Sequence, residues 1–233
     1  MSAEHQLTPG AAGILGKHPG FGDFIAAGLP GVVTRDLGDW AQTVLGQWRD
    51  AMADGWQARF DACPVLRFWI GPAVLGGGAA LRGVWLPSRD RAGRRFPLLV
   101  VQAGGASPIS EPTQDFYEVA LLAATSLQQA ERFEPRDVVE RLHQALPAPS
   151  TGTPDWPVFW AMNAARDAPE LLAELAAADH AHAMTVRSYW WFQPADRPGA
   201  GVLACQGMPG PQELGWLIAG GTPMTNPEAK DET

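Results

Sequence analysis

Two carboxylates in this sequence could form an acid/base pair across two segments framed by glycine and proline. Asp23 lies in the segment GKHPGFGDF at residues 16–24, and Asp90 lies in PSRDRAGRRFP at residues 87–97. Two carboxylates that meet across a fold can act as general acid and general base. The arginines around Asp90 instead favour a permanently ionised carboxylate, and an aspartate in a glycine-rich turn commonly accepts hydrogen bonds from backbone amides. We therefore predict structural or interface roles for both, with catalysis as the alternative.

The glycine-rich segment does not complete a phosphate-binding motif. A P-loop needs Ser or Thr directly after its lysine, whereas Lys17 is followed by His18 and by Pro19, which has no N–H to donate. The pair Gly20 and Gly22 also lacks the third glycine of a dinucleotide fingerprint. We expect no cofactor.

Patterns for metal binding and nucleophilic catalysis are also incomplete. His180 and His182 follow Asp179, but no HExxH motif or cysteine pair completes a metal site. Ser88 and Cys63 have no recognisable base nearby in the sequence, and no GxSxG motif is present. We therefore predict no metal site, and these patterns identify no catalytic nucleophile.

The second segment has a strong local charge. Residues 82–95 contain five arginines and one aspartate, in a chain whose formal net charge is −8. One interpretation is a solvated hairpin whose arginines pair with acids elsewhere in the chain. The other is a docking patch, because arginine binds carboxylate or phosphate with defined geometry. The chain has only two lysines, Lys17 in the first segment and Lys230 in the acidic tail.

The overall composition narrows the classes of partner. An acidic chain of 233 residues without a sustained basic stripe is not expected to bind nucleic acid. No apolar run reaches the length of a membrane span, so no membrane insertion is expected. With no signal peptide visible and two cysteines that read as reduced thiols, we predict a cytoplasmic protein. The ten tryptophans are either core residues or interface anchors.

Hydrophobic periodicity predicts the elements that position these segments. Helices are expected at 36–53, 114–132, from 135 onward, 169–178 and 211–219. Strands are expected at 14–17, 65–70, 81–86, 96–102, 186–192 and 201–206. Three successive strands with short connections predict an antiparallel meander. Because the helices are grouped rather than alternating with strands, we predict an α+β fold, a mainly antiparallel sheet flanked by helices.

We expect a single domain. It covers residues 13–222, between a disordered N-terminus at 1–12 and a disordered acidic tail at 223–233. The segment 146–157, rich in Pro, Ser, Thr and Gly, is the best candidate for a linker or a surface loop.

Five motifs in order resemble the TagF (ImpM-like) family of type VI secretion accessory proteins. They are GKHPGFGDF at 16–24, RFWIGP at 67–72, PSRDRAGRRFPL at 87–98, SYWW at 188–191 and CQGMP at 205–209. His18 departs from the family pattern, in which an apolar residue is usual.

The resemblance implies a non-enzymatic, cytoplasmic, post-translational repressor of type VI secretion. Its expected partner is the forkhead-associated scaffold protein of the secretion system, and a separate protein phosphatase is a second expected partner. The fold implied is a longin-like or profilin-like α+β domain. The motif positions become interaction candidates: Lys17, Asp23, Phe24, Arg67, Trp69, Ser88, Asp90, Arg91, Arg94 and Phe96.

We expect the loops at 16–24 and 87–97 to meet at one end of the sheet. They would then present Lys17, Arg91 and Arg94 to an acidic surface. One alternative is a small hydrolase or phosphatase-like enzyme that uses Asp23 and Asp90, and another is a structural component of the secretion apparatus. Converging carboxylates in a pocket would favour the enzyme, whereas exposed arginines and aromatics would favour the interaction module.

Overall fold

The computed structural model describes residues 7–52, 54–150, 183–193 and 200–221, together with Pro169 and His180. In these residues, a seven-stranded antiparallel sheet has the order β2-β1-β5-β4-β3-β6-β7. Its strands are β1 (Ala12–Gly16), β2 (Ile25–Ala27), β3 (Leu66–Ile70), β4 (Leu81–Leu86), β5 (Leu98–Ala103), β6 (Arg187–Phe192) and β7 (Gly201–Gln206). The helices are α1 (Gly31–Met52), α2 (Trp56–Asp61), α3 (Asp115–Gln129), α4 (Pro135–Ala145) and α6 (Pro211–Ile218).

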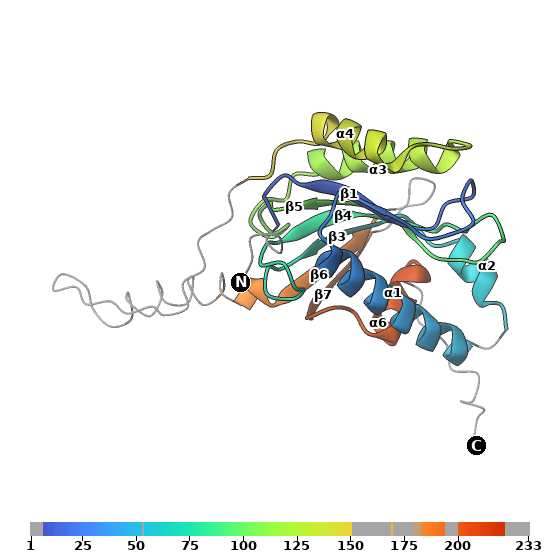
Figure 1. Cartoon of the computed structure of the whole chain (residues 1–233). Helices are drawn as coiled ribbons and strands as arrows, with labels where there is room; N and C mark the ends of the chain where they lie inside the picture. Colours follow the sequence, from blue (N-terminus) through green and yellow to red (C-terminus); the bar gives the residue numbers. More distant parts are fainter. Residues whose placement is uncertain are drawn as a thin grey trace, which may run out of the picture.

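The sheet is built around the meander β3-β4-β5, as the three successive apolar runs predicted. Strand β1 adds beside β5, with Gly16 opposite Leu98, and β6 adds beside β3. Helices cover both faces of the sheet (Figure 1). The predicted α+β class and the antiparallel sheet flanked by helices are therefore confirmed.

Helix α1 covers one face together with α6. Its buried side chains follow a helical spacing: Val33, Leu37, Ala41, Val44 and Trp48. This stripe packs into a core with Trp85 and Trp190, which have no exposed surface. Burying side chains of this size is a main source of stability for the fold. Several of the tryptophans are thus core residues.

Helices α3 and α4 cover the opposite face (Figure 1). Phe116, Ala120 and Leu127 of α3 pack over β4 and β5, and Val138 and Leu142 of α4 complete this second core. Pro135 starts α4 at a first-turn position, where its missing N–H costs nothing.

Short elements account for most of the differences from the sequence predictions. Strand β2 has three residues and α2 has six, so neither is long enough to display a periodic pattern. Helix α1 begins at Gly31 rather than Asp36, because the buried stripe extends back to Val33.

The ordered domain also begins before residue 13. Leu7 is 6% exposed and donates its N–H to the carbonyl oxygen of Gly77, so the predicted disorder over 1–12 does not extend to it. At the candidate linker, Leu146 is buried and the Ser150 hydroxyl accepts from the N–H of Ala106, so residues 146–150 lie against the domain.

Other predictions concern residues that the structure does not describe. The predicted segments concerned are residues 1–6, most of the helix predicted at 169–178, Asp179, His182 and the tail at 223–233. Among the described residues, no helix is long and apolar enough to cross a membrane.

Candidate functional site

The two motif segments meet at one end of the sheet, and the strand register explains why. Strand β1 ends beside the start of β5, so the first loop (residues 17–24) leaves the sheet next to the second loop (residues 87–97). Backbone hydrogen bonds join them, from the N–H of Lys17 to Pro97 O (3.2 Å) and from the N–H of Arg91 to Phe21 O (2.8 Å). The Arg94 guanidinium adds a bond to Gly22 O at 2.7 Å.

Asp90 is the centre of this junction. Its side chain has no exposed surface. Oδ1 accepts hydrogen bonds from the backbone amides of Ala92 (3.0 Å) and Arg94 (2.9 Å). Oδ2 accepts from Arg94 Nε (2.7 Å) and lies 3.0 Å from Lys17 Nζ. The carboxylate thus holds the turn of the second loop and ties it to the first loop.

These contacts keep Asp90 ionised. Burial by itself would raise the pKa of the carboxyl, but hydrogen bonds from Lys17 and from the backbone and side chain of Arg94 outweigh it and hold the pKa well below its usual range. A general acid or base needs a pKa near the working pH. Asp90 is therefore suited to structure rather than to proton transfer.

The same contacts change what the loops present to solvent. Lys17 has only 17% of its side chain exposed and points to Asp90. It is therefore not presented outward, contrary to the sequence prediction. Arg94 keeps 62% of its side chain exposed while it binds Asp90. Arg89 and Arg91 are exposed, whereas Arg95 donates two hydrogen bonds to the carboxylate of Asp61.

A buried histidine fixes the first loop from its other side. His18 accepts the N–H of Gly20 at Nδ1 (3.0 Å), so its Nε2 carries the proton and donates to Leu127 O (2.8 Å). Its ring packs edge-on against Phe21 and Phe133. His18 therefore acts as a neutral, hydrogen-bonded core residue.

This environment predicts a pH dependence of stability. Burial lowers the pKa of His18, and the hydrogen bond to the Leu127 carbonyl only partly opposes it. As the pH falls below 6.5, the unfolded chain takes up a proton before the folded protein does, so stability decreases. We expect His18 to account for a loss of up to about 1.4 kcal/mol at pH 5.5 compared with pH 7.5. Urea unfolding of wild type and His18→Gln at both pH values measures it, and an equal loss in the variant would contradict the prediction.

Phe24 and Phe96 join the loops on the side that faces α1. Phe96 is buried, Phe24 is 42% exposed, and their rings meet edge to face with centroids 5.3 Å apart. Asp23 next to them is exposed. All three residues line the same groove.

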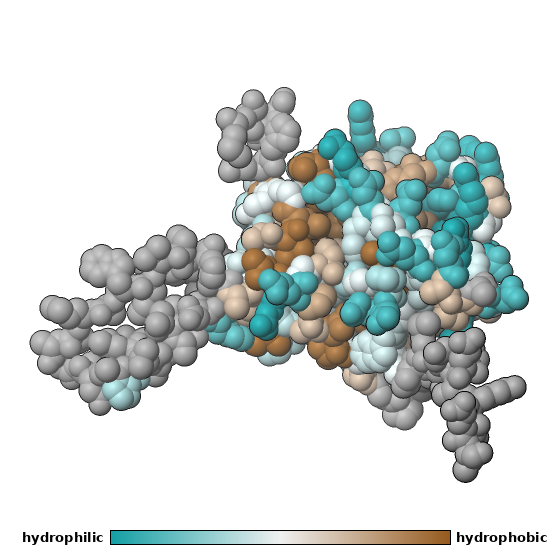
Figure 2. Space-filling model, turned by 90° about the horizontal axis from the view of Figure 1, so that it is seen from below, coloured by the Kyte–Doolittle hydropathy of each residue, from teal (hydrophilic) through white to brown (hydrophobic). Residues whose placement is uncertain are grey.

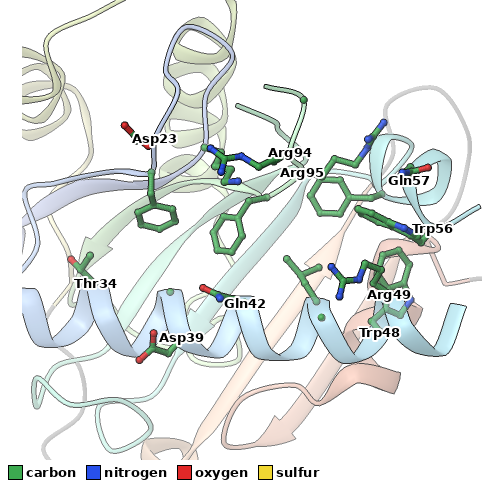
Figure 3. Close-up of a pocket in the computed structure, with 18 of the residues that line it drawn as sticks. Asp23, Thr34, Asp39, Gln42, Trp48, Arg49, Trp56, Gln57, Arg94 and Arg95 are labelled. Carbon is green, nitrogen blue, oxygen red and sulfur yellow. The ribbon is translucent and has the colours of Figure 1, made fainter. Parts of the chain in front are cut away.

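This groove, of about 830 Å³, lies between the two loops, α1 and α2. Its apolar lining residues are Phe24, Leu45, Trp48, Trp56, Phe60 and Phe96. Its charged lining residues are Lys17, Asp23, Arg35, Asp39, Arg49, Arg94 and Arg95. Asp23, Arg94 and Arg95 extend from the loops on one side, and α1 contributes Thr34, Asp39 and Gln42 on the other (Figure 3).

On the face that carries α1 and α6, hydrophilic side chains gather over the half of the molecule where α2 and the loops lie, and hydrophobic side chains gather over the other half (Figure 2). The loop end of the sheet is thus the polar end of this face.

Three candidates lie inside the protein, away from the groove. Arg67 and Trp69 of β3 lie under α3 and its preceding loop, where Arg67 Nη2 bonds Glu118 Oε1 (2.8 Å) and Trp69 Nε1 bonds Gly105 O (3.0 Å). Ser88 is 7% exposed, and its buried hydroxyl has no hydrogen-bond partner among the described residues. None of the three lines the groove.

The geometry does not bring the two candidate carboxylates together in the groove. Asp23 lines it, but Asp90 does not and is turned to Lys17 and Arg94. Among the described residues, no group of three or more His, Cys, Asp or Glu could hold a metal ion. Cys63 and Cys205 are free thiols, and burial raises the pKa of both.

Sequence reasoning did not find the part of the site that α1 supplies. Thr34, Arg35, Gln42 and Arg49 line the groove, yet they lie on the polar side of an amphipathic helix. Hydrophobic periodicity identifies the buried side of such a helix. It does not show which of the remaining residues face two loops that are distant in sequence.

Comparisons with known proteins agree with the motifs. A family model described as the TagF N-terminal domain, type VI secretion system-associated, matches residues 13–148. The crystal structure of PA0076 from Pseudomonas aeruginosa PAO1 superposes with a TM-score of 0.72 at 27% sequence identity, covering 92% of this chain and 97% of that one. No curated protein matches the chain.

Proposed function

Because the chain belongs to the family of the TagF N-terminal domain, which is associated with the type VI secretion system, we propose that it is a post-translational repressor of type VI secretion. It acts in the cytoplasm, without catalysis, by binding the forkhead-associated scaffold protein of the system. A separate protein phosphatase is a second proposed partner. The family match carries this proposal, and the fold shared with PA0076 over nearly the whole chain supports it.

The loop end of the sheet supports a binding role. Arg91 is exposed, and its backbone N–H bonds Phe21 O, so the residue is fixed at the junction of the two loops. Arginine on a rigid loop binds carboxylate groups with little loss of entropy. The enzyme alternative has weaker support, because Asp90 is saturated with donors and outside the groove.

Arg91 provides a test of the loop surface. Arg94 also binds Asp90, so reversing its charge would disturb the loop itself, whereas Arg91 has no ion pair within 4.0 Å among the described residues. We expect Arg91→Glu to weaken binding of the purified scaffold by about tenfold, the range for a charged interface residue. Calorimetric titration measures it, with Arg141→Glu, an exposed change on α4, as the control.

Two outcomes separate the function from the surface. Binding that Arg91→Glu leaves unchanged would retain the scaffold as partner and reject the loop surface. No binding by the wild-type protein would reject the scaffold as partner.

A further inference from the structure

We propose that the groove between α1, α2 and the two loops binds an acidic amphipathic segment of the scaffold protein, an inference that rests on the proposed function. The groove extends along α1 from Thr34 to Arg49. At the rise of an α-helix this distance is about 22 Å. That length accommodates about four turns of a partner helix or about seven residues of an extended chain.

The lining of the groove suits the apolar side of such a segment. Aromatic side chains form much of it, and Phe24 remains 42% exposed even though it contacts Phe96. Trp56 lies below the Arg95 guanidinium, with 5.8 Å from Cζ to the ring centroid. Aromatic residues and arginine are the types enriched at the centres of protein interfaces.

The charges of the groove select an acidic partner. Five cationic residues line it against two carboxylates, those of Asp23 and Asp39, in a chain with a net charge of −8. Lys17 and Arg94 share the buried carboxylate of Asp90, and Arg95 pairs with Asp61. Arg35 has no ion pair within 4.0 Å among the described residues, Arg49 pairs only with the exposed Asp50, and most of the Arg94 side chain is exposed. Arg35 and Arg49 of α1 thus have guanidinium groups that no buried carboxylate neutralises, and Arg94 of the second loop adds a largely exposed side chain that is already paired with Asp90.

Gly46 allows the groove to be filled without damage to the helix. It lines the groove, lies within α1, and a Cβ placed on it would meet no atom within 4 Å apart from the neighbouring backbone of its own helix. Most residues also have a better helix propensity than glycine. Gly46→Trp should therefore fold and occupy the groove. Gln47→Trp is the matched control, because Gln47 is exposed on the same helix and does not line the groove.

The experiment is a calorimetric titration of each variant with the purified scaffold protein. We expect Gly46→Trp to weaken binding by at least about tenfold, as when a central interface pocket is blocked, and Gln47→Trp to bind like wild type. Arg35→Glu should weaken binding more than Arg35→Gln, with a difference that shrinks at high salt. Equal affinities for wild type and Gly46→Trp would overturn the groove proposal and leave the proposed function intact. No binding by wild type would overturn both.

Cross-linking identifies the occupant. A photoreactive amino acid replaces Gln42, which is exposed and lines the groove. In the mixture with scaffold we expect the cross-link to map to an acidic segment of the scaffold. A cross-link to residues 222–233 of this chain, which contain Glu228, Asp231 and Glu232, or to a second copy of the chain would assign the groove to that occupant and overturn the proposal.

Discussion

Replacing Asp90 by alanine should lower the free energy of unfolding by about 3 kcal/mol, the usual cost of removing one partner of a buried ion pair. The change removes the acceptor of two backbone amides and leaves Lys17 and Arg94 without their shared carboxylate. We take the lower end of the range for such losses because Arg94 is largely exposed. Urea unfolding followed by tryptophan fluorescence measures the change.

The matched control for this variant is Asp61→Ala. Asp61 also pairs with an arginine, Arg95, but 46% of its side chain is exposed. Exposed ion pairs contribute less than about 1 kcal/mol. Equal stability of the two alanine variants would contradict the structural role assigned to Asp90.

The Asp90 junction also sets a pH dependence with a defined sign. Its pKa is depressed in the folded protein relative to the ordinary value of 3.8. Its contribution is therefore fully present above pH 3.8 and is lost as the pH falls toward the folded-state pKa. The acid-induced loss of stability below pH 4 should accordingly be smaller in Asp90→Asn than in wild type.

Replacing Gly16 by alanine should destabilise the protein by at least about 3 kcal/mol, since backbone strain and overpacking add. Gly16 ends β1 with a φ of +130°, and a Cβ on it would overlap the carbonyl oxygen of Pro97. This is the point at which the two loops leave the sheet, so the variant should lose the junction as well as stability. Thermal unfolding and near-UV circular dichroism measure both effects.

Gly46→Ala provides the opposite case in the same protein. Gly46 has open space around its Cα and lies in α1. Alanine there should stabilise the protein by up to about 1 kcal/mol. Suppose that Gly16→Ala is as stable as wild type while Gly46→Ala is more stable than wild type. That result would show that β1 and the second loop do not approach as closely as in the structure.

The sequence predicted the central part of the fold for a physical reason. Strands β3, β4 and β5 are continuous buried runs of five or six residues with short connections, and runs of that length between turn residues indicate buried strands rather than helices. Strand β2 and helix α2 were missed because three and six residues carry no periodic signal. Their places are set by tertiary contacts, such as the packing of Phe60 in the core.

The site could be predicted only in part. Glycines, prolines and charges identified the two loops, and the strand order explains why they meet. The composition of the second loop could not show which charges are used internally. The same sequence is compatible with a buried carboxylate that binds Lys17 and Arg94 and with an exposed basic patch. Only the fold separates the buried Asp90 from the exposed Arg89 and Arg91.

Export by the type VI system in the organism that carries this chain tests repression most directly. Exported and intracellular amounts of one type VI substrate are compared in wild-type cells, in cells lacking this protein and in cells that overproduce it. A post-translational repressor should raise export when absent and abolish it when overproduced, with the total amount of substrate unchanged. Export that stays constant in all three strains, with the protein shown to be folded and present, would contradict the proposed function.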